Sequence, residues 1–240
     1  MKQNKAILII HGFAGGPYDE EPISNYLELK SYDVFNFTLP GHDKMLFNKI
    51  TKDDWINSCR EHLELLISNN YEYITVIGHS MGGVLACILA SEYKEITRLV
   101  LAAPAFKYLT FEEEDFKFLT ALKNSSKLFE DYSKEEIIAR ILQFPMSVIK
   151  EFMTLIKENY DIPSKIDTPT LIIQGKNDKV VPVKSAEYVY KTLKSKNKHL
   201  MLLDEVTHDV FKGKKVNDIC IAIEQFIRNG RYTYDEDKKY

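Results

Sequence analysis

Short apolar segments alternate with segments of helical periodicity along most of this sequence. Residues 6–10 (AILII), 73–77 (YITVI) and 170–174 (TLIIQ) are largely apolar runs of the kind found in strands buried on both faces. Such alternation predicts an α/β fold, with a doubly wound, mostly parallel sheet covered by helices on both faces. We expect further strands at 33–37, 97–102 and 199–203, and helices at 21–30, 52–69, 81–93, 147–160, 185–194 and 216–228.

The alternation is interrupted between about residues 105 and 165, where no strand pattern appears. Thr110–Glu113 and Ser133–Glu136 have the spacing of capping boxes, and residues 147–160 carry an apolar helical stripe. The segment is too long for a simple connecting loop. We therefore expect a single domain, 1–240, with a small helical cap inserted at about 105–165.

Composition and charge exclude several classes of protein. The chain has 240 residues, enough for one sizeable core, and its net charge of -3 gives no reason to expect a nucleic-acid partner. No apolar run approaches the roughly 18 residues of a membrane helix, and the amino-terminal run is too short for a signal peptide. Cys59, Cys87 and Cys220 lack metal-ligand spacing and fit a reducing compartment. The sequence predicts a cytoplasmic protein, either monomer or dimer.

Ser80 lies in the segment Gly78-His79-Ser80-Met81-Gly82, between a predicted strand and a predicted helix. This Gly-x-Ser-x-Gly pattern is typical of the nucleophile elbow, a strained turn that presents a serine hydroxyl above the carboxyl end of a strand. The residues two positions from the serine must be small, because any side chain there would collide with the turn. An alternative is that the glycines merely permit a tight turn between a strand and a helix.

A serine nucleophile needs a base, and His208 is our candidate among six histidines. It follows the predicted strand 199–203, on a loop that should open at the same end of the sheet as Ser80. His42 also follows a predicted strand and is the competing candidate. His79 adjoins the serine, so its side chain is not expected to turn back to the hydroxyl.

Asp178 is our candidate for the acid that orients the base. It follows the predicted strand 170–174, and the chain order Ser, Asp, His is that of α/β-hydrolase triads. Asp204 and Asp209 lie close to His208 in sequence, but near neighbours rarely reach the correct side of an imidazole. The alternative role for Asp178 is that of a turn or helix cap.

Two backbone N–H groups are expected to bind the oxyanion that forms during acyl transfer. The Met81 N–H lies at the start of the helix after Ser80, and the Phe13 N–H lies in the glycine-rich segment 11–16 after the first strand. A phosphate-binding loop is the alternative for this segment. The Gly-Lys-Ser/Thr ending and the dinucleotide-binding spacing of such loops are both absent.

Taken together, these motifs resemble the α/β-hydrolase superfamily, and more narrowly the small bacterial carboxylesterases and monoacylglycerol lipases. The resemblance implies Ser80 as nucleophile, Asp178 and His208 as its partners, Phe13 and Met81 as oxyanion donors, and a helical cap at about 105–165. Asp43 stands where many relatives have glycine. The motifs are HGF at 11–13, LPGH at 39–42, GHSMGG at 78–83, GKNDKVVP at 175–182 and THD at 207–209.

From these motifs we expect a serine carboxylesterase that hydrolyses short- to medium-chain acyl esters, monoacylglycerols among them. Such a triad needs no metal and no organic cofactor, and the partner is a small-molecule ester. A thioesterase, an acyltransferase or a carbon–carbon bond hydrolase would use the same residues. A non-catalytic ligand-binding protein is the alternative from another class. Several apolar side chains could line an acyl pocket or simply pack the cap: Phe106, Phe116, Phe118, Phe144, Met146 and Phe152.

Overall fold

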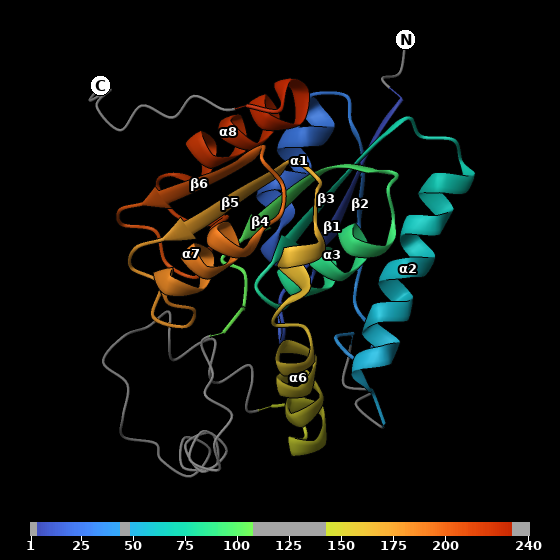
Figure 1. The fold of residues 1–240 in the computed structure, drawn as a ribbon, viewed down its shortest axis with the longest axis vertical. Coiled ribbons are helices and arrows are strands. Elements are labelled where there is room, and N and C mark those ends of the chain that lie inside the picture. Colours follow the sequence, from blue (N-terminus) through green and yellow to red (C-terminus); the bar gives the residue numbers. More distant parts are fainter. Residues whose placement is uncertain (1–3, 44–48, 108–142, 232–240) are drawn as a thin grey trace.

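A six-stranded parallel sheet forms the centre of the computed structural model, which describes residues 4–43, 49–107 and 143–231 (Figure 1). Its strand order is β2-β1-β3-β4-β5-β6, and every neighbouring pair is parallel. The chain therefore adds β2 on one side of β1 and β3 on the other. The strands are β1 (Lys5–Ile10), β2 (Asp33–Asn36), β3 (Tyr73–His79), β4 (Ile96–Ala102), β5 (Thr170–Gly175) and β6 (Lys198–Leu203).

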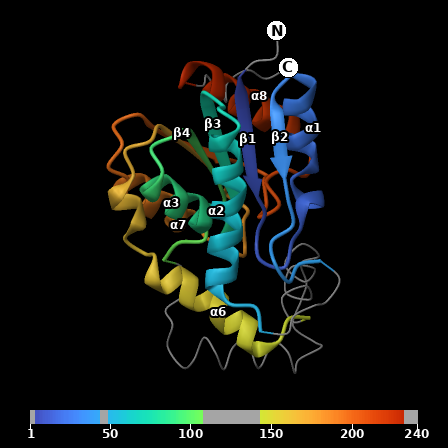
Figure 2. The same cartoon turned by 90° about the vertical axis from the view of Figure 1, so that its right-hand side faces the viewer.

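Helices cover both faces of the sheet, as the alternating sequence pattern predicts (Figures 1 and 2). Successive residues of β1 show the division, because Ile7 and Ile9 pack in one apolar cluster while Leu8 and Ile10 pack in the other. The first cluster includes α1 (Glu21–Leu29) and α8 (Val216–Asn229). The second includes α2 (Lys52–Ser68), α3 (Met81–Glu92) and α7 (Val183–Thr192).

Helix α3 is the most enclosed helix among the described elements. Every residue from Met81 to Ala90 is buried, so the helix is apolar on all sides rather than amphipathic. It contacts the strands β1, β3 and β4, and also α2, α6 (Met146–Glu158) and the short helix η2 (Ile162–Lys165). This enclosure holds the start of α3, where Ser80 lies, in a fixed place.

The interruption in the pattern falls between β4 and β5. Helix α6 belongs to this segment and lies beyond the carboxyl ends of the strands (Figure 2). Both predicted capping boxes, Thr110–Glu113 and Ser133–Glu136, lie outside the described residues. The boundaries of a cap at about 105–165, and the single-domain organisation, stay predictions.

The expected elements match the observed ones with small differences at their ends. Helix α7 begins at Val183, two residues before the predicted start, because Pro182 is its N-cap and its fixed φ favours helix initiation nearby. All three cysteines are free and buried, as small apolar residues of helices would be. In the described ranges, no helix has the length and apolar character needed to span a membrane.

Candidate active site

Ser80 occupies a strained turn between β3 and α3. Its backbone has φ 54° and ψ -115°, a combination that residues with a side chain rarely adopt. The turn is held by three backbone hydrogen bonds. The Ser80 N–H donates to the Ala102 carbonyl (2.9 Å), and the Ser80 carbonyl accepts from the N–H groups of Gly83 (3.0 Å) and Ala105 (3.2 Å). The geometry is that of the predicted nucleophile elbow.

The two glycines that flank this turn are required by close backbone contacts. A Cβ atom at Gly78 would overlap the Gly82 carbonyl, and one at Gly82 would overlap the carbonyl of Ile10. Both obstacles are backbone atoms, which cannot move aside without shifting β1 or α3. The glycines are therefore steric requirements, as the sequence pattern suggests.

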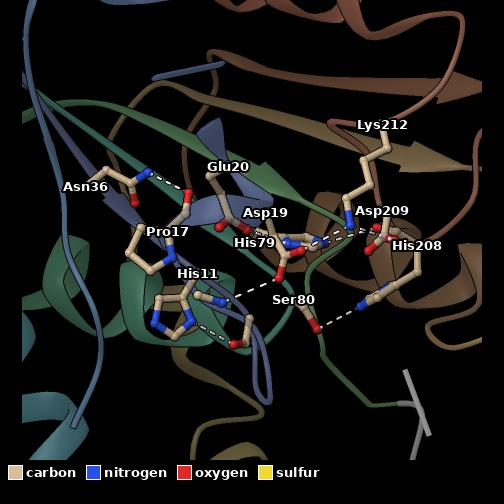
Figure 3. Close-up of polar contacts among 12 residues, drawn as sticks. His11, Pro17, Asp19, Glu20, Asn36, His79, Ser80, His208, Asp209 and Lys212 are labelled. Carbon is tan, nitrogen blue, oxygen red and sulfur yellow. Dashed lines mark hydrogen bonds and ion pairs between the residues drawn. The ribbon is translucent and has the colours of Figure 1, made fainter. Parts of the chain in front are cut away.

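His208 lies on the loop after β6 and points toward Ser80 (Figure 3). Its Nε2 lies 3.1 Å from Ser80 Oγ, and its Nδ1 lies 2.9 Å from Asp178 Oδ2. An ionised carboxylate can only accept, so the neutral imidazole carries its proton on Nδ1 and leaves Nε2 free to accept from the Ser80 hydroxyl. The structure thus brings together the three residues that were predicted to act together.

The two carboxylate oxygens of Asp178 have different partners. Oδ1 accepts from the backbone N–H groups of Val180 and Val181, both at 2.8 Å, while Oδ2 faces His208. One oxygen of Asp178 therefore caps the turn, while the other bonds to the imidazole. Burial would raise the pKa of Asp178, but the hydrogen bonds and charge of His208 and the two N–H groups outweigh it and lower the pKa. Asp178 stays ionised at neutral pH.

Gln174, the penultimate residue of β5, is a further polar contact of the acid, and the sequence pattern does not identify it. Its buried Nε2 donates to Asp178 Oδ2 at 2.9 Å and approaches the carbonyls of Val181 (3.1 Å) and Gly175 (3.3 Å). The amide therefore holds the same carboxylate oxygen that faces His208. In sequence, Gln174 reads as an ordinary strand residue, so no local signal marks it.

The two expected oxyanion donors lie close to Ser80. The N–H groups of Phe13 and Met81 donate no hydrogen bond to another described residue, which leaves them available to a substrate oxygen. Gly12 packs so closely that a Cβ atom there would lie 3.1 Å from Ser80 Cβ. A small cavity of about 30 Å³ lies between the segment 12–15 and the side chains of Ser80 and His208.

Aromatic side chains surround Phe13. Its ring stacks on Phe152 of α6, with centroids 4.5 Å apart, and lies 4.7 Å from the ring of Phe144. Both of these phenylalanines, like Phe106, are buried members of the apolar core, so in this structure they act as packing residues. Met146 is partly buried against the same core. The other two candidates for an acyl pocket, Phe116 and Phe118, lie outside the described residues.

His42, the competing candidate for the base, and the neighbouring His11 have other partners. His42 Nδ1 bonds to the Pro40 carbonyl at 3.2 Å, and its ring packs against those of His11 and Phe13. His11 accepts from the Leu39 N–H through Nε2 (3.0 Å) and donates from Nδ1 to the Gly12 carbonyl (2.8 Å). His11 therefore links the glycine-rich segment 11–16 to the segment after β2.

The protonation state of His11 leads to a pH prediction. Burial, and then the neighbouring His42, lower its pKa to about 3, so the folded protein binds fewer protons than the unfolded chain below pH 6.5. The contribution of His11 to stability is complete above pH 6.5 and is lost as the pH falls toward 3. We expect His11 to remove about 2 kcal/mol of unfolding free energy between pH 6.5 and 5, since each pH unit corresponds to about 1.4 kcal/mol.

Urea unfolding at pH 7 and pH 5 measures this effect. His11→Gln supplies a comparison, because its side-chain oxygen can still accept from the Leu39 N–H but does not titrate. The variant should lose less stability than the wild type over this pH range. An identical pH dependence in both proteins would show that His11 is not the titrating group.

Comparisons with known proteins agree with this geometry. A family model described as serine aminopeptidase, S33, matches residues 1–215. A carboxylesterase of Bacillus subtilis (strain 168) is 26% identical over 229 residues, which cover 93% of this chain and 92% of the relative. A thermostable monoacylglycerol lipase of Bacillus sp. (strain H-257) is 26% identical over 210 residues, covering 84% and 82%.

Solved structures show the same fold. A structure from work on two metagenome-derived lipolytic enzymes has a TM-score of 0.78 at 21% identity and covers 95% of both chains. The matched family model spans the segment from β1 to the loop that carries His208. The chain therefore belongs to the serine aminopeptidase, S33, family, and it is a serine hydrolase of the α/β-hydrolase superfamily.

Proposed function

We propose that this protein is a carboxylesterase of the cytoplasm that hydrolyses short- to medium-chain acyl esters, monoacylglycerols among them. The observation that carries the proposal is the hydrogen-bonded series from Ser80 Oγ through His208 to Asp178, at 3.1 and 2.9 Å, beside two available N–H groups. The named activities of the Bacillus relatives, a carboxylesterase and a monoacylglycerol lipase, support ester substrates.

Acylation is the first half of the proposed reaction. Ser80 Oγ attacks the ester carbonyl carbon while its proton passes to His208 Nε2. The carbonyl oxygen becomes an oxyanion, which accepts from the N–H groups of Phe13 and Met81. Ionised Asp178 stabilises the imidazolium that forms. The bond to the alcohol then breaks, and His208 returns the proton to the leaving alkoxide, so that the free alcohol departs from an acyl-Ser80 intermediate.

Deacylation repeats the same proton transfers with water. His208 Nε2 takes a proton from water, whose oxygen attacks the acyl carbon. The same two N–H groups bind the second oxyanion, and each is expected to contribute about 10²–10³-fold to turnover. The bond to Ser80 breaks, His208 protonates Oγ, and the carboxylic acid leaves. The enzyme returns to its starting state without a redox step.

The carboxylates beside Ser80 have a partner that competes with an aminoacyl substrate. An aminopeptidase needs a carboxylate to bind the substrate's α-ammonium group. The two carboxylates that line the small cavity, Asp19 and Asp209, are already paired with Lys212, at 3.1 and 3.3 Å. Within the described ranges, each of these two carboxylates has Lys212 as its cationic partner, and the three charges sum to −1.

A substrate panel tests the proposal. Oxygen esters from acetate to laurate, their thioester counterparts, and aminoacyl p-nitroanilides should be compared by kcat/KM. We expect oxygen esters of short and medium acyl length to be hydrolysed best, with no second substrate needed. A preference of more than about tenfold for thioesters would indicate a thioesterase, and faster cleavage of the anilides would indicate an aminopeptidase. Either outcome contradicts the carboxylesterase proposal.

A further inference from the structure

A buried acid–imidazole pair lies behind the triad and has no role in the proton transfers above. Glu20 is 0% exposed and His79 is 5% exposed. His79 Nδ1 lies 2.8 Å from Glu20 Oε1, and His79 Nε2 lies 3.0 Å from the backbone carbonyl of His208 (Figure 3). The His79 side chain therefore contacts the main chain of the proposed base, His208.

The proton positions in this pair follow from its partners. A carbonyl oxygen only accepts, so His79 Nε2 carries a proton and donates it to the His208 carbonyl. Burial would lower the pKa of His79, but its hydrogen bond and charge interaction with Glu20 outweigh burial and raise the pKa to about 9. Burial also raises the pKa of Glu20, so the pair shares a proton between Glu20 Oε1 and His79 Nδ1 while His79 Nε2 donates to the His208 carbonyl.

The bonds form a closed ring that includes the nucleophile and the base. His79 and Ser80 are consecutive residues at the carboxyl end of β3, so their relative positions are covalently limited. From His79 the ring continues to the His208 carbonyl, and from the His208 imidazole it returns to Ser80 Oγ at 3.1 Å. A displacement of the His208 backbone must therefore break a buried hydrogen bond to the residue beside the nucleophile.

The His208 loop connects β6 to α8, and its residues 204–215, all of them described, belong to neither a helix nor a strand. It is also held by backbone bonds, because Val210 N–H donates to the same His208 carbonyl (2.8 Å) and Asn177 N–H donates to the Val206 carbonyl (3.1 Å). The side chains of Val206, Val210 and Phe211 are buried.

The ion pairs of Lys212 with Asp19 and Asp209 also tie this loop to the segment before α1, but the Lys212 side chain is 43% exposed. Exposed ion pairs contribute little to positioning, whereas a buried charged hydrogen bond contributes more.

We propose that His79 and Glu20 are positioning residues, which hold the His208 main chain so that its imidazole stays within hydrogen-bonding distance of Ser80. His79 makes the contact, and Glu20 fixes the orientation of the His79 ring. This inference rests on the proposed function, since it assigns His208 as the base. A misplacement of a catalytic group by about 1 Å can lower turnover by about 10²-fold.

Three variants test the role of the pair. His79→Phe removes both hydrogen bonds, and we expect kcat to fall about 10–100-fold while KM changes less than about threefold. Glu20→Leu removes the partner of Nδ1, and we expect a fall of about tenfold. In Glu20→Gln, the amide can donate to Nδ1 of a neutral His79, which still donates from Nε2 to the His208 carbonyl. This variant should keep at least about a third of wild-type kcat.

Ile223→Ala is the control for lost stability. Ile223 is buried in α8, away from the hydrogen-bonded ring, so this variant should lower the melting temperature without changing kcat per folded molecule. The folded fraction of each protein is measured by circular dichroism. Wild-type kcat per folded molecule in His79→Phe, or an equal loss in Glu20→Gln and Glu20→Leu, would overturn the positioning role.

A second measurement separates this inference from the proposed function. The rate at which a fluorophosphonate labels Ser80 depends on His208 but not on the identity of the ester. Absence of ester hydrolysis by the wild type would refute the proposed function alone. The positioning role would still require slower labelling of Ser80 in His79→Phe than in the wild type and in Ile223→Ala. Equal labelling rates in all three proteins would refute it.

Discussion

Ser80→Ala is expected to lower kcat for p-nitrophenyl ester hydrolysis by at least about 10⁴-fold. The variant lacks the oxygen that attacks the carbonyl, while the N–H groups of Phe13 and Met81 remain. Residual activity should therefore come only from binding and oxyanion stabilisation. Steady-state kinetics over a range of enzyme concentrations measures the loss, and fluorophosphonate labelling followed by peptide mapping should place the label on Ser80 in the wild type.

Ser91→Ala is the matched serine control for this experiment. Ser91 lies near the other end of α3, and its hydroxyl bonds only to the local carbonyl of Ile88 at 2.8 Å in the described structure. We expect it to retain wild-type kcat. If Ser80→Ala kept more than about 1% of the activity of Ser91→Ala, the assignment of Ser80 as nucleophile would be wrong.

Asp178→Asn should produce the second largest loss, about 10³–10⁴-fold in kcat. The asparagine oxygen would keep the place of Oδ1, where it accepts from the N–H groups of Val180 and Val181. Its NH₂ group would then face His208 Nδ1. An imidazole that accepts at Nδ1 carries its proton on Nε2, where it cannot accept the Ser80 proton.

The same variant creates a second conflict on the other side of the carboxylate. Gln174 Nε2 donates to Asp178 Oδ2 at 2.9 Å, so the new NH₂ group would face another donor. We expect a lower melting temperature as well as lower kcat. Asp204→Asn is the control, because Asp204 is exposed and pairs with Lys176 away from the triad. A kcat for Asp178→Asn within about tenfold of this control would contradict the orienting role of Asp178.

The parts of the site that could be predicted from the sequence are those with a local cause. The elbow is encoded in residues 78–83, because the glycines and the serine that define it are close together in the chain. Asp178 and His208 could be assigned because each follows an apolar strand, and the carboxyl ends of parallel strands meet at one edge of the sheet. The comparisons confirm the fold and the family, whereas the catalytic roles stay predictions.

The parts that could not be predicted depend on contacts between distant segments. Glu20 lies in an acidic run at the start of α1, where acidic residues are ordinary because they interact favourably with the helix dipole. Its burial depends on His79, 59 residues away, and no periodic pattern marks that contact. Gln174 is similarly inconspicuous until the loop containing Asp178 folds back over it.

The backbone of Ser80 has a consequence for the evolution of this protein. Glycine adopts a φ of 54° without strain. For a residue with a Cβ atom, this conformation lowers the free energy of unfolding by about 1–3 kcal/mol. The packing of the enclosed helix α3 and the buried strand β3 must offset that loss of stability. Selection for thermal stability alone would therefore favour glycine at this position, and serine will persist only where turnover is selected as well.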